Sequence, residues 1–181
     1  MKIIKKIFDI YKKAFWTYTK QARNAGVTIG ELNFVSSHFW SSEPYLIKIG
    51  SHCQITSGVK IYTHGGAGAV RRWYPQFDIF GKVTIGDYVY IGNNSLIMPG
   101  VTIGDNVLIA AGSIVTKSIP PNVVVAGNPA KYVCSIEEYI EKNKKYNTDS
   151  KGLSNERKKE LLLSLDESKF VHKSLLKVEN P

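Results

Sequence analysis

Residues 85–116 read IGDYVY IGNNSL IMPGVT IGDNVL IAAGSI VT, and this stretch decides the fold. An aliphatic residue returns at every sixth position, namely Ile85, Ile91, Ile97, Ile103, Ile109 and Val115. A period of six fits neither an amphipathic helix nor an alternating strand. It is typical of a parallel β-helix, in which each six-residue unit forms a short strand and a turn. The pattern therefore predicts an all-β core of hexapeptide repeats.

The same pattern predicts how the coils are filled. Three repeats, about 18 residues, form one triangular coil, and the aliphatic residue points into the prism. The glycine, asparagine and aspartate residues are expected at the corners, where a positive φ is often needed. Cys53 stands at an inward position, so we expect it to be a small core residue.

Composition limits the class of protein. The chain has 181 residues, 43% of them hydrophobic, which suits one domain with a small appendage. Its net charge is +9, but the basic residues gather at the two ends and no nucleic-acid motif is present, so no nucleic-acid partner is expected. No apolar run approaches the ~20 residues that cross a bilayer. The start lacks the apolar centre of a secretory signal, and two cysteines suggest no disulfide framework, so we expect a cytoplasmic protein.

The chain divides into three predicted regions. Residues 1–24 form a basic N-terminal segment, and apolar residues at helical spacing in 2–22 predict an amphipathic helix. This helix would cap the open end of the β-helix, and residues 1–22 could also contact an anionic membrane at the inner face. Residues 25–134 form the β-helix. Residues 135–181 form a tail with helices from about 136 to 146 and from 155 to 165.

Two interruptions break the repeats, at 36–45 and at 64–80. Ile61 and Ile85 are four repeats apart, since 85 − 61 = 24, so the phase survives the second interruption. We therefore predict that 64–80 is a loop thrown out from one corner, and loops of this length are usually functional. His64 opens the loop and is followed by two glycines. An imidazole suits a general base, although a corner histidine bonded to its own loop is an equally ordinary reading.

These features resemble a known family. The regular coils, the Thr-His-Gly-Gly motif at 63–66 and the exit motif VTKSIPPNVVVAGNPAK at 115–131 are similar to the hexapeptide-repeat acyltransferases. The likeness spans about residues 47–133 and is strongest to the sugar and xenobiotic O-acetyltransferase branch. It implies a left-handed parallel β-helix, a homotrimer with active sites between neighbouring prisms, and acetyl-CoA as the donor, without a metal.

The resemblance also implies roles for residues. His64 matches the catalytic histidine, which takes the proton of the acceptor hydroxyl in a direct transfer. Asn93 and Ala111 match positions along the groove for the pantetheine arm. Thr116, Lys117 and Lys131 match positions toward the nucleotide end, where lysines suit phosphate.

The acceptor is predicted from the loop. We expect a saccharide, free or lipid-linked, in surface polysaccharide or oligosaccharide biosynthesis. Trp73 and Tyr74 would stack on a sugar ring, and Arg71 or Arg72 would meet a phosphate or carboxylate. An equally ordinary reading is that the aromatic residues anchor the loop to the prism. Asp78 would orient His64 or bind acceptor hydroxyls.

Three alternatives remain open. The first is N-acetylation of an amino sugar or a nucleotide-linked amino sugar on the same fold. The second is a γ-class carbonic anhydrase, which needs three zinc-bound histidines, and the surroundings of the four histidines do not give that pattern. The third is a non-catalytic trimeric scaffold.

Overall fold

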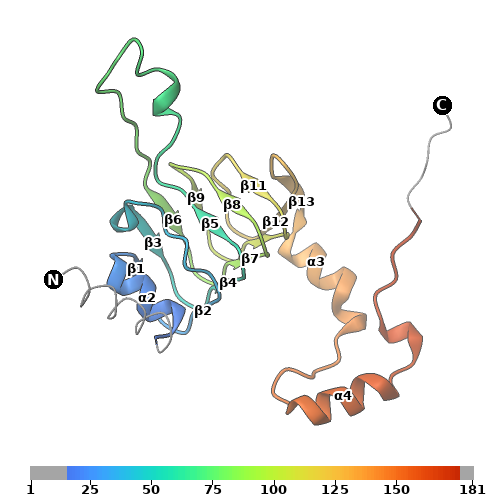
Figure 1. Ribbon diagram of the computed structural model, residues 1–181. Helices are drawn as coiled ribbons and strands as arrows, with labels where there is room; N and C mark the ends of the chain where they lie inside the picture. The colour runs from blue at the N-terminus through green and yellow to red at the C-terminus, as the bar shows by residue number, and fades with distance from the viewer. Residues whose placement is uncertain (1–15, 176–181) are drawn as a thin grey trace, which may run out of the picture. The chain divides into compact units, whose positions relative to one another are not determined.

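The computed structural model describes residues 16–175, and Figure 1 labels their helices and strands. The chain divides into two compact units, one up to Ile136 and one from Glu137 onward. The first unit is a left-handed parallel β-helix of very short strands. The predicted boundaries at 24/25 and 134/135 stay predictions.

Three parallel sheets form the sides of the prism. Sheet A runs β1 (Thr28–Ile29), β3 (Ile47–Ile49), β6 (Val83–Ile85) and β9 (Thr102–Ile103). Sheet B runs β2 (Phe34–Val35), β4 (Gln54–Ile55), β7 (Tyr90–Ile91), β10 (Leu108–Ile109) and β12 (Val123–Ala126), with β13 (Lys131–Ser135) antiparallel at its edge. Sheet C runs β5 (Lys60–Ile61), β8 (Leu96–Ile97) and β11 (Ile114–Val115).

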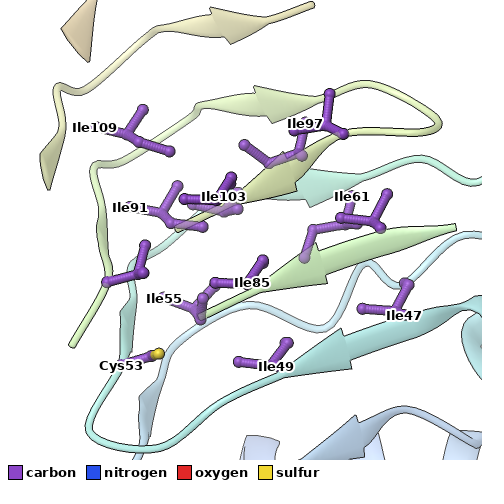
Figure 2. Packing of buried hydrophobic residues seen from close by; sticks show 14 of the residues in the cluster. Ile47, Ile49, Cys53, Ile55, Ile61, Ile85, Ile91, Ile97, Ile103 and Ile109 are labelled. Carbon is purple, nitrogen blue, oxygen red and sulfur yellow. The ribbon is translucent and has the colours of Figure 1, made fainter. Parts of the chain in front are cut away.

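The predicted inward positions form the core. Strands of neighbouring coils pair in register, so that Ile55 lies beside Ile91 and Ile61 beside Ile97. Figure 2 shows these isoleucines pointing into the prism, and each is under 2% exposed. Burying a side chain of this size stabilises the fold by about 1.5–3 kcal/mol. Cys53 is also buried there as expected, and burial raises the pKa of its thiol.

The glycines of the repeats were expected to supply positive φ at the corners, but most of them have another role. The left-handed corner positions are held by Gly58, Asn94 and Gly112 at one corner, but by Leu32, His52, Tyr88, Asn106 and Asn122 at another. Glycines that directly follow the core aliphatic residue, such as Gly92, are not in the left-handed region. They are required by space, because the next coil passes too close for a Cβ.

The first interruption, residues 36–45, still places one side chain in the core of the prism. Phe39 bridges Lys60 in parallel, which places the following residue, Trp40, in the inward position beside Ile61. Trp40 is 5% exposed, so a tryptophan fills the place that an aliphatic residue holds elsewhere. The segment then turns through the short 3₁₀ helix η1 (Pro44–Leu46) into β3.

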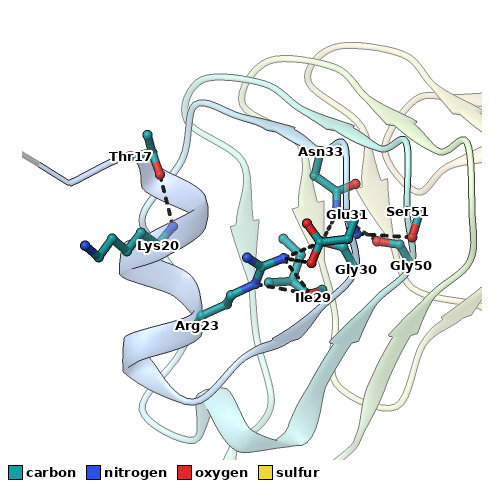
Figure 3. Close-up of polar contacts among 9 residues, drawn as sticks. All are labelled: Thr17, Lys20, Arg23, Ile29, Gly30, Glu31, Asn33, Gly50 and Ser51. Atoms are coloured by element: carbon teal, nitrogen blue, oxygen red, sulfur yellow. Dashed lines mark hydrogen bonds and ion pairs between the residues drawn. The ribbon is translucent and has the colours of Figure 1, made fainter.

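The predicted N-terminal helix is described only from residue 16 onward. Helix α2 (Tyr18–Ala25) begins after Thr17, whose hydroxyl accepts the Lys20 amide, and ends at Gly26 with φ of 113°. Its Ala22 is buried in the core cluster. Arg23 donates to the carbonyl oxygens of Ile29 and Gly30 and pairs with Glu31 at 2.8 Å (Figure 3). The described part of the helix therefore covers the first coil, as the capping interpretation expects.

The second interruption leaves the prism as a loop, as predicted. It connects β5 to β6, projects from the coils in Figure 1, and contains only the short 3₁₀ helix η2 (Ala67–Ala69). Phe80 bridges His64 antiparallel at its root. The coil phase resumes at β6, which pairs in register with β3.

The C-terminal helices follow the expected positions. Helix α3 (Ile136–Asn143) continues into η3 (Lys144–Tyr146), and α4 (Asn155–Ser164) starts from a cap by Ser154, whose hydroxyl accepts the Arg157 amide. The 3₁₀ helix η4 (Glu167–Lys169) follows. None of the helices formed by residues 16–175 has the length and apolar character that a membrane span requires.

Candidate active site

His64 lies where the loop leaves the prism, just after β5. Its ring meets that of Phe80 with centroids 6.0 Å apart and planes tilted by 60°. The imidazole therefore lies against Phe80, where the loop returns to the prism. Its side chain is 39% exposed, so a ligand can reach it.

A carboxylate holds the imidazole from the other side. His64 Nδ1 lies 2.7 Å from Glu43 Oε2, and the Thr63 hydroxyl donates to the same oxygen at 2.8 Å. The hydrogen bond from Thr63 is the main cause that lowers the pKa of Glu43; partial burial opposes it, and His64 lowers it further. Glu43 is therefore ionised at neutral pH. An ionised carboxylate only accepts hydrogen bonds, so the imidazole hydrogen sits on Nδ1.

The second ring nitrogen remains for chemistry. Nε2 of His64 has no hydrogen-bond partner among residues 16–175. The ring lines a groove of about 830 Å³. The groove is bounded by Tyr62, His64, Gly65, Gly66, Ile79, Phe80, Gly81, Leu96, Met98, Pro99 and Gly100. Apart from the imidazole and a phenol, these side chains are apolar, so Nε2 of His64 stands beside an apolar wall.

The predicted pantetheine positions flank sheet C. Asn93 precedes β8 and Ala111 precedes β11 on the next coil. The Asn93 carbonyl accepts the Gly112 amide at 2.8 Å, so the two predicted positions lie side by side at one corner. Both side chains are exposed.

The predicted nucleotide-end positions lie farther along the prism. Tyr62, Met98 and Thr116 each directly follow a strand of sheet C, and these strands pair in register on successive coils. The Tyr62 amide donates to the Ile97 carbonyl, and the Met98 amide donates to the Val115 carbonyl. Lys117 lines a cavity of about 190 Å³ with Ala130 and Tyr132. Lys131 lies between those two residues in the chain but does not line that cavity.

Asp78 does not contact His64, which was one of the two roles predicted for it. Asp78 pairs with Arg71 at 3.9 Å, and the carboxylate that reaches His64 is Glu43. Asp78 and Arg71 thus brace the loop against itself. Trp73 is 67% exposed, and the Arg72 guanidinium lies 5.9 Å from its ring centre.

Comparison with known proteins places this geometry in a family. Residues 82–117 match the model for the bacterial transferase hexapeptide (six repeats). Protein CapG of Staphylococcus aureus is 48% identical over 153 residues, which cover 82% of this chain and 89% of CapG. The chain belongs to the hexapeptide-repeat acetyltransferase family.

Two further members of this acetyltransferase family are similar to the chain. The galactoside O-acetyltransferase of Escherichia coli is 34% identical, with 75% of this chain and 68% of that enzyme covered. A hexapeptide-repeat acetyltransferase of Vibrio cholerae, solved in complex with acetyl coenzyme A, is 28% identical with a TM-score of 0.54, covering 63% of this chain and 73% of that one. The exposed face of sheet C and the His64 groove are therefore features of an acetyltransferase.

The histidines of this acetyltransferase are spread apart. His52 stacks on Tyr88 with ring centres 4.6 Å apart, and His38 stacks on Tyr18 at 6.0 Å. Within residues 16–175 no group of three histidine, cysteine or acidic side chains could hold a metal ion. The zinc alternative therefore has no ligand set in the part of the chain that the structure describes.

Glu43 is the site residue that the sequence pattern did not indicate. It comes from the interruption at 36–45, where the six-residue period stops. One signal was available: Glu43 is the sole acidic residue of that interruption. The spacing to His64 could not be used, because the number of residues in an irregular segment does not give its path.

Proposed function

We propose that this protein is an acetyl-CoA-dependent O-acetyltransferase that acts on a sugar hydroxyl, with His64 as the general base. One observation supports the proposal most. His64 Nδ1 rests on an ionised carboxylate at 2.7 Å, which leaves Nε2 as the basic nitrogen at the groove.

The proposed reaction is a direct transfer. Nε2 of His64 takes the proton of the acceptor hydroxyl as that oxygen attacks the thioester carbonyl. The tetrahedral intermediate then expels the thiolate of CoA, which takes the proton back from His64. A positioned base contributes about 10²–10⁴-fold to such a reaction, and holding both substrates together lowers the barrier further.

The donor would lie along the exposed face of sheet C. Asn93 and Ala111 at one corner would border the pantetheine arm, and Thr116 and Lys117 would stand near the nucleotide. Lys131 would add a second positive charge toward the phosphates. The relative that was solved with acetyl coenzyme A supports this donor, because it is similar to 63% of this chain with a TM-score of 0.54.

The acceptor would be a saccharide bound between His64 and the loop. Trp73 would present an exposed ring for stacking, and Asp78 would accept from sugar hydroxyls. We place the reaction in surface polysaccharide or oligosaccharide biosynthesis in the cytoplasm. Contact of residues 1–22 with the inner membrane face is part of the same proposal, and these residues lie mostly outside the described chain.

The active form would be a homotrimer. Sheet C carries half-buried Leu96 and Ile114 on its outer face, and sheet B carries exposed Phe34 and Tyr90. These apolar side faces suit packing between prisms. Sedimentation analysis at several concentrations would measure the assembly, and a monomer at all concentrations would contradict this part.

The test of the chemistry is thiol release from acetyl-CoA with a panel of saccharides. His64→Ala should lower turnover by about 10²–10⁴-fold. His52→Ala is the matched control, because His52 stacks on Tyr88 at another corner and should retain activity. Full turnover by His64→Ala would contradict the role of the base.

The panel also separates the alternatives. Including amino sugars and nucleotide-linked amino sugars decides between hydroxyl and amine acceptors. A wild-type protein that releases no thiol with any acceptor, and binds no acetyl-CoA in calorimetry, would instead agree with a non-catalytic scaffold.

A further inference from the structure

We propose that Glu43 and Thr63 act together as positioning residues, which hold His64 in the tautomer that has a free Nε2. This inference rests on the proposed role of His64 and adds the hydrogen bonds that fix the tautomer of its ring. The two residues come from different coils and meet only in the folded chain.

The device is a chain of four polar groups. The Ser41 hydroxyl oxygen accepts the Thr63 amide at 3.3 Å and lies 2.9 Å from the Thr63 hydroxyl oxygen. The Thr63 hydroxyl lies 2.8 Å from Glu43 Oε2, which in turn meets His64 Nδ1 at 2.7 Å. Thr63 is fully buried, and the Glu43 side chain is 17% exposed.

The direction of the hydrogen bonds follows from counting hydrogens. A threonine hydroxyl has one hydrogen, and an ionised carboxylate is a stronger acceptor than a serine hydroxyl. The Thr63 hydrogen therefore goes to Glu43, and Ser41 donates its own hydrogen to Thr63. Each group then has one arrangement, which ends with a hydrogen on Nδ1 of His64.

Both partners of the carboxylate oxygen matter for position. Oε2 of Glu43 receives Thr63 on one side and His64 on the other. Because Thr63 directly precedes His64 in the chain, the same short segment carries both donors to one oxygen. Removing the hydroxyl leaves the carboxylate free to rotate away from the imidazole.

A purely structural role predicts a different outcome. The same contacts fasten the interruption 36–45 to residues 63–64, just after β5, so losing them would lower stability without changing the tautomer of His64. The readouts must therefore report on the ring itself. Two suit this purpose: the nitrogen-15 shifts of the His64 side chain, and the separation of kcat from KM.

The experiment compares Thr63→Val with Thr63→Ser in the full chain. Valine keeps the shape and loses the hydroxyl, whereas serine keeps the hydroxyl. We expect wild type and Thr63→Ser to show hydrogen on Nδ1 and Thr63→Val to show a mixture of tautomers. Turnover of Thr63→Val should fall by about 10–100-fold, with the KM for acetyl-CoA changed less than about twofold.

Glu43→Gln gives a second, independent arm. Thr63 and His64 meet the same carboxylate oxygen, so the glutamine presents either its oxygen or its nitrogen to both of them. With the nitrogen in that place, the amide donates to Nδ1 and moves the ring hydrogen to Nε2. We expect this second tautomer beside the first in the spectrum, and a loss of turnover at least as large as in Thr63→Val. Glu43→Asp, which keeps the charge, should recover part of it.

Two results would overturn the proposal. One is a Thr63→Val protein with the wild-type tautomer, and the other is a Thr63→Val protein with the kcat of Thr63→Ser. The spectra do not depend on turnover. An inactive wild-type protein with the expected spectra would therefore contradict the proposed function while supporting the assignment of Glu43 and Thr63.

Discussion

Gly92 lies so close to Ala111 on the next coil that a Cβ added to Gly92 would stand 2.4 Å from the Ala111 nitrogen. Since the obstacle is backbone, no side chain can move aside. We expect Gly92→Ala to lower the free energy of unfolding by about 1–3 kcal/mol, as overpacking does. Denaturant titration measures this change.

The control for that substitution is Gly68→Ala. A Cβ on Gly68, which lies in the loop, meets no atom within 4 Å. It should leave the unfolding midpoint close to wild type. Equal destabilisation by both variants would show that the close approach of the coils is not the cause.

Ala111 gives a prediction about the donor. Its side chain is exposed, so Ala111→Leu should not disturb the core. If the pantetheine arm runs past this corner, the larger side chain obstructs it and raises the KM for acetyl-CoA. We expect about a tenfold increase, which corresponds to about 1.4 kcal/mol of lost binding. Steady-state kinetics with varied acetyl-CoA measure it, and an unchanged KM at wild-type stability would place the arm elsewhere.

The pKa of Glu43 predicts how stability depends on pH. This pKa is lowered in the folded protein from its ordinary value of 4.5, chiefly by the hydrogen bond from Thr63. The stabilisation is thus complete above the unfolded value and is lost as the pH falls through the lowered folded value. Glu43→Gln lacks this contribution. The difference in free energy of unfolding between wild type and Glu43→Gln should shrink as the pH falls below 4.5.

Denaturant titrations across that range measure the difference. In Thr63→Val the main cause of the lowered pKa is removed, so its pH-dependent loss of stability should be smaller and should end closer to 4.5 than in wild type. A difference between wild type and Glu43→Gln that stays constant through this range would contradict the linkage.

Trp73 tests the acceptor side. Its side chain is 67% exposed, so Trp73→Ala should leave the fold intact. Loss of an aromatic stacking partner costs about 0.5–1.5 kcal/mol. We expect the KM for the saccharide to rise by a few-fold while the KM for acetyl-CoA stays the same. Tyr139→Ala, which removes an exposed ring from α3, is the control.

The period of six was enough to predict the prism, its core and the loop. Ile61 and Ile85 are in phase, and the structure keeps that phase across 64–80. The pattern could not show that Trp40 fills an inward position, because it searched only for aliphatic residues. The tryptophan is nevertheless buried where an aliphatic residue lies in the other coils. The pattern also assigned the glycines to positive φ, whereas Gly92 is needed for the closeness of neighbouring coils.

The period of six also pointed to His64, but it could not point to Glu43. His64 stands where the period stops, so the sequence marks it. Glu43 reaches it from an irregular segment 21 positions earlier, and a contact of that kind depends on the path of the chain. The expected carboxylate, Asp78, is nearer in sequence but is engaged by Arg71. Of the two roles predicted for Asp78, the structure gives the contact with His64 to Glu43, and the binding of acceptor hydroxyls stays a prediction.

The bridge between His64 and Phe80 closes the loop where it leaves the prism, and the coils on either side remain in phase. The loop between these two residues is thus structurally separate from the coils. We therefore expect changes in its length to leave the core isoleucines in place. If the loop binds the acceptor as proposed, exchanging this one segment would change the acceptor while the coils stay the same.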